Sequence, residues 1–357
     1  MSSTEQPRDL EALGWDDAWG AMFARFRERG LEPARISAPH RGGAYDVLTS
    51  ASVAAAAVRA HLPARTRRTP SSDVPVVGDW VALDPNGETP TIEAVLPRRT
   101  KLSRRAAHDP GADVAREQVV AANVDVVFIT ASLADELSAR LLERYLTLAW
   151  ESGASPAILL MKADLEPDSE RIADELAEIA GHVPIAAVST RTGFGLERVR
   201  SLLGPGMTGA LIGPSGVGKS TLVNTLVGEE VLDTGDVADD GSGRHTTTRR
   251  QLVLLPGGGI VVDNPGIREL HLWLADEGLD ETFADIVELA SHCRFADCRH
   301  ETEPGCAVQA ALASGDLSAE RWASYRELQR ELAELEERLA RRGRSRARRM
   351  RPGTGDS

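Results

Sequence analysis

The chain has 357 residues, a hydrophobic content of 42% and a formal net charge of −13, which suits a soluble protein of two or three domains. No apolar run approaches the roughly 20 residues of a membrane span, and the polar start, with Glu5 and Asp9, is unlike a signal peptide. We therefore expect a cytoplasmic monomer that does not bind membranes.

The first 35 residues are predicted to be a helical extension. One amphipathic pattern runs from Trp15 to Arg29, and its apolar stripe includes Trp19, Phe23 and Phe26. A stripe of this kind packs against a core more often than it forms a functional surface.

Residues 36–110 have the pattern of a small β-barrel. Short strand-like runs at 44–48, 76–83 and 91–96 are separated by turns rich in glycine and proline, as in a barrel of the OB type. Basic side chains form two clusters beside these runs: Arg65, Arg67 and Arg68, and then Arg98, Arg99, Lys101, Arg104 and Arg105. The clusters predict an RNA-binding face, and the alternative is a barrel surface that is merely soluble.

Alternation of strands and helices begins at Asn123 and predicts a doubly wound α/β domain over residues 111–280. The expected strands are 124–130, 157–161, 183–188, 210–212, 251–255 and 260–262. The helices between the first of them are expected at 137–152, 168–181 and 195–203. Ligands of such a sheet bind at the carboxyl ends of its strands.

A base-recognition motif follows the second of these strands. The segment Met161-Lys162-Ala163-Asp164 resembles the guanine-specificity motif Asn-Lys-x-Asp, and Ser189-Thr190 after the next strand resembles the loop that meets guanine O6. The aspartate accepts hydrogen bonds from guanine N1–H and the exocyclic amine, groups that adenine lacks, so adenine would leave a carboxylate unpaired. Because Met161 stands where asparagine is usual, we expect weaker guanine affinity with unchanged selectivity.

A phosphate-binding motif follows the fourth strand. The segment Ile212-Gly213-Pro214-Ser215-Gly216-Val217-Gly218-Lys219-Ser220 fits the P-loop pattern Gly-x-x-x-x-Gly-Lys-Ser. Small residues let backbone N–H groups converge on phosphate oxygens, and the following helix start adds its positive end. Lys219 is expected to reach the β- and γ-phosphates, and the Ser220 hydroxyl to ligate Mg²⁺. A chance glycine turn is the alternative, which the flanking strand and helix disfavour.

The order of these motifs is unusual. In ordinary GTPases the P-loop comes first and the base-specificity motifs last, whereas here Asp164 and Ser189 precede Gly213. Downstream come Gly243–Thr248 and Asp263–Gly266, of which the second matches Asp-x-x-Gly. The cyclic order is kept and only the starting point has moved, which indicates a circular permutation.

The predicted catalytic group comprises Lys219, Thr247, Asp263, Gly266 and His245. Asp263 is expected to bind Mg²⁺ through water, the Gly266 N–H to sense the γ-phosphate, and Thr247 to be the magnesium ligand among three adjacent threonines. His245 is a candidate helper of catalysis, and a structural loop histidine is the alternative. Ile267 stands where many GTPases place the glutamine that orients water, so turnover of the isolated protein should be slow.

All three cysteines lie in one short window near a histidine. Cys293, Cys298, His300 and Cys306 form a Cys₃His set that suits tetrahedral Zn²⁺, and four protein ligands leave no open position, so the site would be structural. His292 is the alternative to His300, and buried cysteines without a metal are the alternative to the site.

The C-terminal region is predicted to be a mainly helical zinc-binding domain at 281–340 and a basic disordered tail at 341–357. Its last helix is expected from Ala319 to Arg342. Residues 338–351 contain eight arginines and no acidic residue, on an otherwise acidic chain. That distribution favours contact with nucleic acid, and a solvated tail without a partner is the alternative.

Together these motifs resemble one family, the circularly permuted bacterial GTPases that act on the small ribosomal subunit (ribosome small subunit-dependent GTPase A, or YjeQ/RsgA). The resemblance rests on the permuted order, GRHTTT at 243–248, DNPG at 263–266 and FADCRHETEPGCAV at 295–308, and it covers residues 36–330. It implies a factor in late maturation of the 30S subunit that binds GTP, GDP and 16S rRNA, with GTP hydrolysis stimulated by that subunit.

Two other functions remain open at this point. An RNA-binding module that uses nucleotide mainly as a conformational ligand is favoured by Ile267 and Met161. An ATPase of another class is disfavoured by Asp164 and Ser189.

Overall fold

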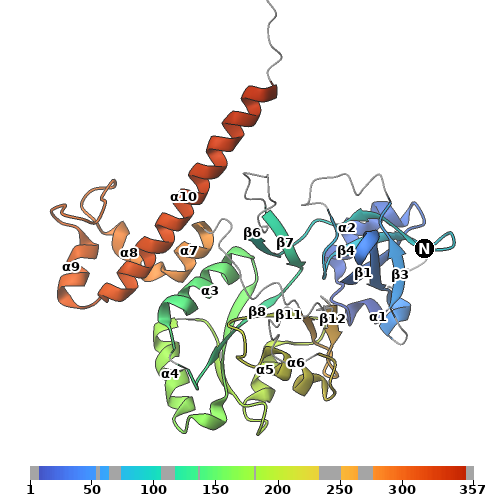
Figure 1. The fold of residues 1–357 in the computed structure, drawn as a ribbon, viewed down its shortest axis with the longest axis horizontal. Helices are drawn as coiled ribbons and strands as arrows, with labels where there is room; N and C mark the ends of the chain where they lie inside the picture. Colours follow the sequence, from blue (N-terminus) through green and yellow to red (C-terminus); the bar gives the residue numbers. More distant parts are fainter. Residues whose placement is uncertain are drawn as a thin grey trace, which may run out of the picture. The chain divides into compact units, whose positions relative to one another are not determined.

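The structure is a computed structural model that describes residues 8–53, 57–63, 74–105, 117–135, 137–180, 182–232, 251–263 and 276–350 (Figure 1). Among these residues, no helix combines the length and the apolar character needed to cross a membrane. The chain divides into two compact units: Met1–Ser103 with Gln118–Leu137 and Ser152–Leu270, and Arg104–Glu117 with Ser138–Glu151 and His271–Ser357.

The first unit contains a closed barrel with the strand order β1-β2-β3-β5-β4. Its strands are β1 (Glu32–Pro39), β2 (Ala44–Leu48), β3 (Val58–His61), β4 (Trp80–Asp84) and β5 (Thr91–Val95). The strand β1 pairs with both β2 and β4, which closes the barrel, and β3 runs parallel to β5. Buried side chains such as Ile36, Val81 and Ile92 fill the interior. The OB-type barrel predicted from the sequence is confirmed.

Two helices precede the barrel, α1 (Arg8–Glu11) and α2 (Asp17–Arg27). Asp16 caps α2 by accepting a hydrogen bond from the Trp19 backbone N–H at 2.9 Å. Trp15 packs edge-on against Trp80 of β4, with ring centroids 4.7 Å apart, and Phe23 is fully buried. The apolar stripe is therefore a packing surface, as predicted.

A six-stranded sheet with the order β10-β9-β8-β11-β13-β12 forms the rest of this unit. Its strands are β8 (Val126–Ser132), β9 (Ser155–Met161), β10 (Ile185–Val188), β11 (Thr208–Ile212), β12 (Gln251–Leu254) and β13 (Ile260–Asp263). All pairs are parallel except β12 with β13, so the carboxyl ends of five strands share one edge. The predicted α/β sheet is confirmed, with each strand within a few residues of its expected bounds.

Three helices of this unit follow strands of the six-stranded sheet: α4 (Ser169–Ala180), α5 (Leu196–Leu202) and α6 (Lys219–Val227). Leu196 and Val199 of α5 and Leu222 and Leu226 of α6 join the buried cluster that covers Phe128 of β8. The spacing of these residues is the three-to-four-residue period of an amphipathic helix, which explains why the sequence located them.

A two-stranded sheet pairs β6 (Lys101–Arg105) with β7 (Glu117–Ala122). These strands, and β1 and β3 of the barrel, were not predicted from the sequence. The strand β1 contains Pro33, Pro39 and an arginine, and lacks regular alternation, so its sequence reads as a loop although the barrel makes it a central strand.

The second unit is mainly helical. Its helices are α3 (Ala139–Glu151), α7 (Asp276–Thr282), α8 (Ala284–Ser291), α9 (Ala307–Ser314) and α10 (Ala319–Met350). The helix α10 passes residue 341, where the sequence analysis placed the start of a disordered tail, so that prediction is wrong as far as Met350. Arg and Ala are strong helix formers, and the first proline after the helix is Pro352.

Helix α3 belongs to this second unit although it lies between β8 and β9 in the sequence. It packs closely against α7, since a Cβ atom on Gly278 would lie only 2.3 Å from the Thr147 carbonyl oxygen. Such an approach between two helices requires glycine at that position. From the sequence, this helix was expected to belong to the α/β domain at 111–280.

Candidate nucleotide site and metal centre

The predicted P-loop connects β11 to α6 at the carboxyl edge of the sheet. The backbone has φ values of 142°, 74° and 108° at Gly213, Gly216 and Gly218, a region that other residues rarely adopt. At Gly213 a Cβ atom would also lie 2.2 Å from Thr130 Oγ1 of β8. Thr130 donates a hydrogen bond to the Ile212 carbonyl at 2.9 Å, so β8 supports the base of the loop.

Lys219 is the side chain whose contacts within the loop are defined. Lys219 Nζ donates to the carbonyls of Gly213 at 2.8 Å and Pro214 at 2.5 Å, which holds the ammonium across the loop. Val217 is buried, Ser220 is half-buried in the first turn of α6, and Pro214, Ser215 and Gly216 are exposed. Backbone N–H groups at a helix start together with a lysine form an anion site.

The predicted base-recognition segments lie on the adjacent strands β9 and β10, with Met161 paired beside Val188. Ser189 donates a hydrogen bond from Oγ to Asp164 Oδ1 at 2.6 Å, and Arg191 Nε lies 3.7 Å from Oδ2. The Ser189 hydrogen bond is the main cause that lowers the pKa of Asp164, and Arg191 adds to it. The carboxylate is therefore ionised at neutral pH and able to accept hydrogen bonds.

Other residues of the base motif define its shape. Lys162 has a left-handed backbone, with φ 62° and ψ 37°, at the turn from β9 into the short helical turn Ala163–Leu165. Ala163 is buried and Thr190 is half-buried. Met161 is 1% exposed, and its Cε lies 3.6 Å from the Cβ position of Gly218, so this side chain packs against the P-loop. An apolar contact therefore stands where asparagine would offer an amide.

Several predicted catalytic residues cannot be placed. His245, Thr247 and Gly266 lie outside the described residues, and Asp263 is described only as the last residue of β13, beside β11 in the sheet. Two residues that the sequence analysis missed do contribute to the site, Thr130 and Arg191. Thr130 lies near the end of the apolar strand β8, where a single hydroxyl carried no recognisable signal.

The predicted metal ligands converge in the second unit. One ligand atom from each of Cys293, Cys298, His300 and Cys306 lies within 4.8 Å of the others. Cys293 and Cys306 Sγ are 3.9 Å apart, and each is 3.4 Å from His300 Nδ1. This group can hold a metal ion, and His300 rather than His292 belongs to it.

The loop around this group is braced by hydrogen bonds that the sequence did not suggest. Gln309 donates from Nε2 to the His300 carbonyl at 2.6 Å, and its backbone N–H contacts Cys306 Sγ at the start of α9. Glu303 accepts from three backbone N–H groups, of Arg299, Glu301 and Thr302, and these bonds lower its pKa to about 2. The ligand geometry is therefore held by the loop itself.

Part of the predicted RNA-binding face has another role. Arg98 forms two 2.8 Å bonds with both carboxylate oxygens of the buried Asp79, and Arg99 forms bonds of 2.5 and 2.6 Å with Asp16. Arg98 is bound inside the barrel region, because a carboxylate as buried as Asp79 needs a cation beside it, whereas Arg99 joins this region to the start of α2. Arg65, Arg67 and Arg68 lie outside the described residues.

Comparison with known proteins gives consistent matches over the whole architecture. Residues 95–273 match the family model described as RsgA GTPase. A Streptomyces coelicolor protein named small ribosomal subunit biogenesis GTPase RsgA is 44% identical over 341 residues, 93% of this chain and 89% of that one. A protein of the same name from Methanosarcina acetivorans is 44% identical over 90% of this chain and 84% of its own length.

Solved structures agree with these matches. The crystal structure of YjeQ from Thermotoga maritima superposes with a TM-score of 0.63 at 28% identity, covering 85% of this chain and 99% of that one. YloQ, described as a circularly permuted GTPase, has a TM-score of 0.58 at 24% identity, covering 86% and 96% of the two chains, and supports the fold alone.

Proposed function

The chain belongs to the RsgA GTPase family, and from that premise we propose that it hydrolyses GTP during late maturation of the 30S ribosomal subunit. The observation that carries the proposal is the shared sheet edge on which the Asp164–Ser189 pair and the Gly213–Lys219 loop lie. Base selection and phosphate binding both require that arrangement.

Guanine selectivity is assigned to Asp164. Its carboxylate accepts from guanine N1–H and the exocyclic amine, while Ser189 fixes its orientation. Adenine offers neither donor, so ATP would leave the carboxylate unpaired and bind weakly. The stem of Lys162 covers one face of the base, and Thr190 belongs to the loop facing guanine O6.

The phosphate end is assigned to the P-loop, with Lys219 moving from its two carbonyl partners to the β- and γ-phosphates. Ser220 and Asp263 would hold magnesium: Ser220 lies in the first turn of α6, and β13, which ends at Asp263, is the neighbour of β11. Magnesium bound with GTP neutralises charge on the β- and γ-phosphates. Thr247, Gly266 and His245 complete the proposed catalytic group.

The proposed reaction is attack of water on the γ-phosphorus. Water forms the new P–O bond, GDP leaves with the β–γ bridging oxygen, and the proton of the water passes to solvent or phosphate. Since Ile267 offers no side-chain hydrogen bond to orient water, the isolated chain is expected to turn over slowly. Binding to the small subunit would orient the attacking water, so that fast GTP hydrolysis depends on the subunit.

The metal is proposed to be a single structural Zn²⁺. A tetrahedral ion with Zn–S of about 2.3 Å and Zn–N of about 2.0 Å separates its ligands by roughly 3.5 to 3.8 Å. The 3.9 Å between the Cys293 and Cys306 sulfurs and the 3.4 Å from each to His300 Nδ1 are close to that spacing, and all four ligand atoms lie within 4.8 Å of one another. Three thiolates with one imidazole are the donors zinc prefers. Zinc would lock the loop that leads into α9.

The proposed partner is the 30S subunit, contacted through 16S rRNA by a monomeric, cytoplasmic protein. The barrel, the metal-bearing domain and the arginines at 338–351 are the proposed contacts, because phosphate-rich RNA attracts such surfaces in a salt-dependent way. A nucleotide-switched RNA-binding module is the second candidate, favoured by Ile267 and by the apolar contact of Met161.

The test measures GTP and ATP hydrolysis with and without purified 30S subunits at two salt concentrations. Turnover restricted to GTP, raised severalfold by 30S and reduced by salt, is the expected result. Binding of 30S without stimulation would favour the nucleotide-switched module. Equal turnover of ATP would overturn the role of Asp164.

A further inference from the structure

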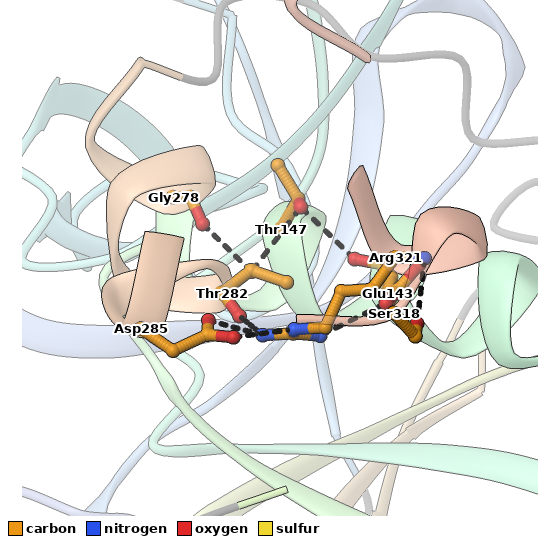
Figure 2. Close-up of polar contacts among 7 residues, drawn as sticks. All are labelled: Glu143, Thr147, Gly278, Thr282, Asp285, Ser318 and Arg321. Carbon is orange, nitrogen blue, oxygen red and sulfur yellow. Dashed lines mark hydrogen bonds and ion pairs between the residues drawn. The ribbon is translucent and has the colours of Figure 1, made fainter. Parts of the chain in front are cut away.

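A buried polar network in the second unit joins α10 to α3, α7 and α8 (Figure 2). Arg321 of α10 donates to Glu143 of α3 at 2.9 Å, and through Nε and Nη2 to Asp285 of α8 at 2.8 and 2.6 Å. It also donates to the Thr282 carbonyl at 3.0 Å, and its guanidinium lies 4.8 Å from the centre of the Phe283 ring. One side chain thus contacts three other helices or their ends.

The Arg321–Glu143 pair is more buried than an ordinary surface ion pair, whereas the Asp285 side chain is 48% exposed. The side chains of Arg321 and Glu143 are 19% and 10% exposed. Burial raises the pKa of Glu143, and its contacts with Ser324 and Arg321 oppose that shift. Removing Arg321 would leave the largely buried Glu143 carboxylate without its cation, which costs more than breaking an exposed pair.

A second set of bonds fastens α3 to α7 in the same place. The Thr147 hydroxyl of α3 donates to the Glu143 carbonyl at 2.9 Å and lies 3.2 Å from the Thr282 hydroxyl, which donates to the Gly278 carbonyl at 2.7 Å (Figure 2). Together with the close approach at Gly278, these contacts make α3, α7 and α10 one packed group.

Residues 133–138 connect β8, the strand that supports the P-loop, to the amino-terminal end of α3. Thr130 near the end of β8 bonds the Ile212 carbonyl and abuts Gly213 of the P-loop. Just after β8, the Leu133 N–H donates to the Met161 carbonyl at 2.9 Å. The chain segment between β8 and α3 is therefore the covalent route from α3 to the residues that contact the P-loop and the base motif.

We propose that Arg321 is a positioning residue for subunit-stimulated GTP hydrolysis. It holds α7 and α8, which precede the metal-ligand loop, against α3. When these helices bind the ribosomal subunit, their shift would move α3 and, through the chain that joins α3 to β8, the P-loop. The inference rests on the proposed function. It assigns the coupling to a buried arginine that neither touches nucleotide nor ligates the metal. The alternative is an ion pair that only stabilises the fold.

The experiment compares full-length wild type with Arg321→Met, Arg321→Lys and Arg140→Met, measuring GTP turnover with and without purified 30S subunits. Arg140→Met is the matched control, since Arg140 and Glu327 also join α3 to α10 but their side chains are 60% and 33% exposed. Zinc content and thermal unfolding are measured for each variant.

Arg321→Met is expected to keep its basal turnover and its zinc, and to lose about three- to tenfold in the ratio of stimulated to basal turnover. Arg321→Lys, which keeps the charge but cannot span Glu143, Asp285 and the Thr282 carbonyl, should lie between it and wild type. Arg140→Met should keep the wild-type ratio. If Arg321→Met lost its metal or its fold, Arg321→Lys would carry the same comparison.

An unchanged ratio in folded, zinc-loaded Arg321 variants would overturn the inference and leave the proposed function intact. An equal loss in Arg140→Met would also overturn it, because any weakened contact between the two helices would then suffice. A wild-type chain that 30S does not stimulate would overturn the proposed function and the inference together.

Discussion

Arg35 provides the sharpest test of how the barrel is fastened to its surroundings. Its side chain is 2% exposed and donates to three carbonyls, of Gly78 at 3.2 Å, Leu13 at 2.5 Å and Asn123 at 3.0 Å. These acceptors come from the barrel, the N-terminal helices and the segment before β8. One guanidinium therefore joins three parts of the first unit.

The expected loss of stability in Arg35→Met follows from the hydrogen bonds that the substitution would remove. Burial lowers the pKa of Arg35 to about 10, so the guanidinium is still charged at neutral pH, but the native state bears a desolvation cost that methionine avoids. Against that gain, the Leu13 and Asn123 carbonyls would lose this donor, at about 1–3 kcal/mol each, while the Gly78 carbonyl would keep its bond from Asn123 Nδ2. We expect a net loss of about 3–5 kcal/mol in the free energy of unfolding, as for a broken buried pair.

The assay is urea and thermal unfolding followed by circular dichroism. For a unit of this size the loss corresponds to a fall of about 6–20 °C in the unfolding midpoint. Arg59→Met is the control, since Arg59 is 52% exposed beside Asp46 and should cost about 1 kcal/mol or less. If both variants unfolded at the same midpoint, the three carbonyl bonds would contribute nothing measurable and the reasoning would be refuted.

Four further substitutions test the sites. Asp164→Asn should weaken GTP binding and favour xanthosine triphosphate, because the C2 carbonyl of xanthine can accept a hydrogen bond from the new amide. The ratio of the two dissociation constants should change by about 100-fold. A variant that still prefers GTP would show that Asp164 does not recognise the base. Gly213→Ala should weaken nucleotide binding at least tenfold, roughly the effect of one lost phosphate contact, because its Cβ would lie 2.2 Å from Thr130 Oγ1. Gly216→Ala, with no atom within 4 Å, should bind more tightly than Gly213→Ala, and the reverse order would contradict the steric argument. Cys306→Ser should lose the single bound zinc and helical circular dichroism, and retention of stoichiometric zinc by atomic absorption would exclude Cys306 as a ligand.

The sequence located the P-loop and base motifs at the ends of buried strands because these patterns are local. A P-loop needs small residues and a lysine at fixed spacing, so Gly213 and Lys219 were recognisable without any tertiary information. The buried strands around them are continuous apolar runs, and their bounds followed from that pattern. The Cys₃His set was equally local, and the structure brings its four ligand atoms together.

Only the tertiary structure decided how side chains far apart in the chain are paired. Arg98 and Arg99 looked like an RNA-binding cluster, but the fold brings them to Asp79 and Asp16, and the pairing leaves less charge for a partner. Helix α3 reads as part of the sheet domain, and packing assigns it to the second unit through Gly278 and Arg321. The physical reason is that a sequence pattern reports periodicity and spacing over one or two turns, whereas the partner of a charge is fixed by which distant elements the core brings together.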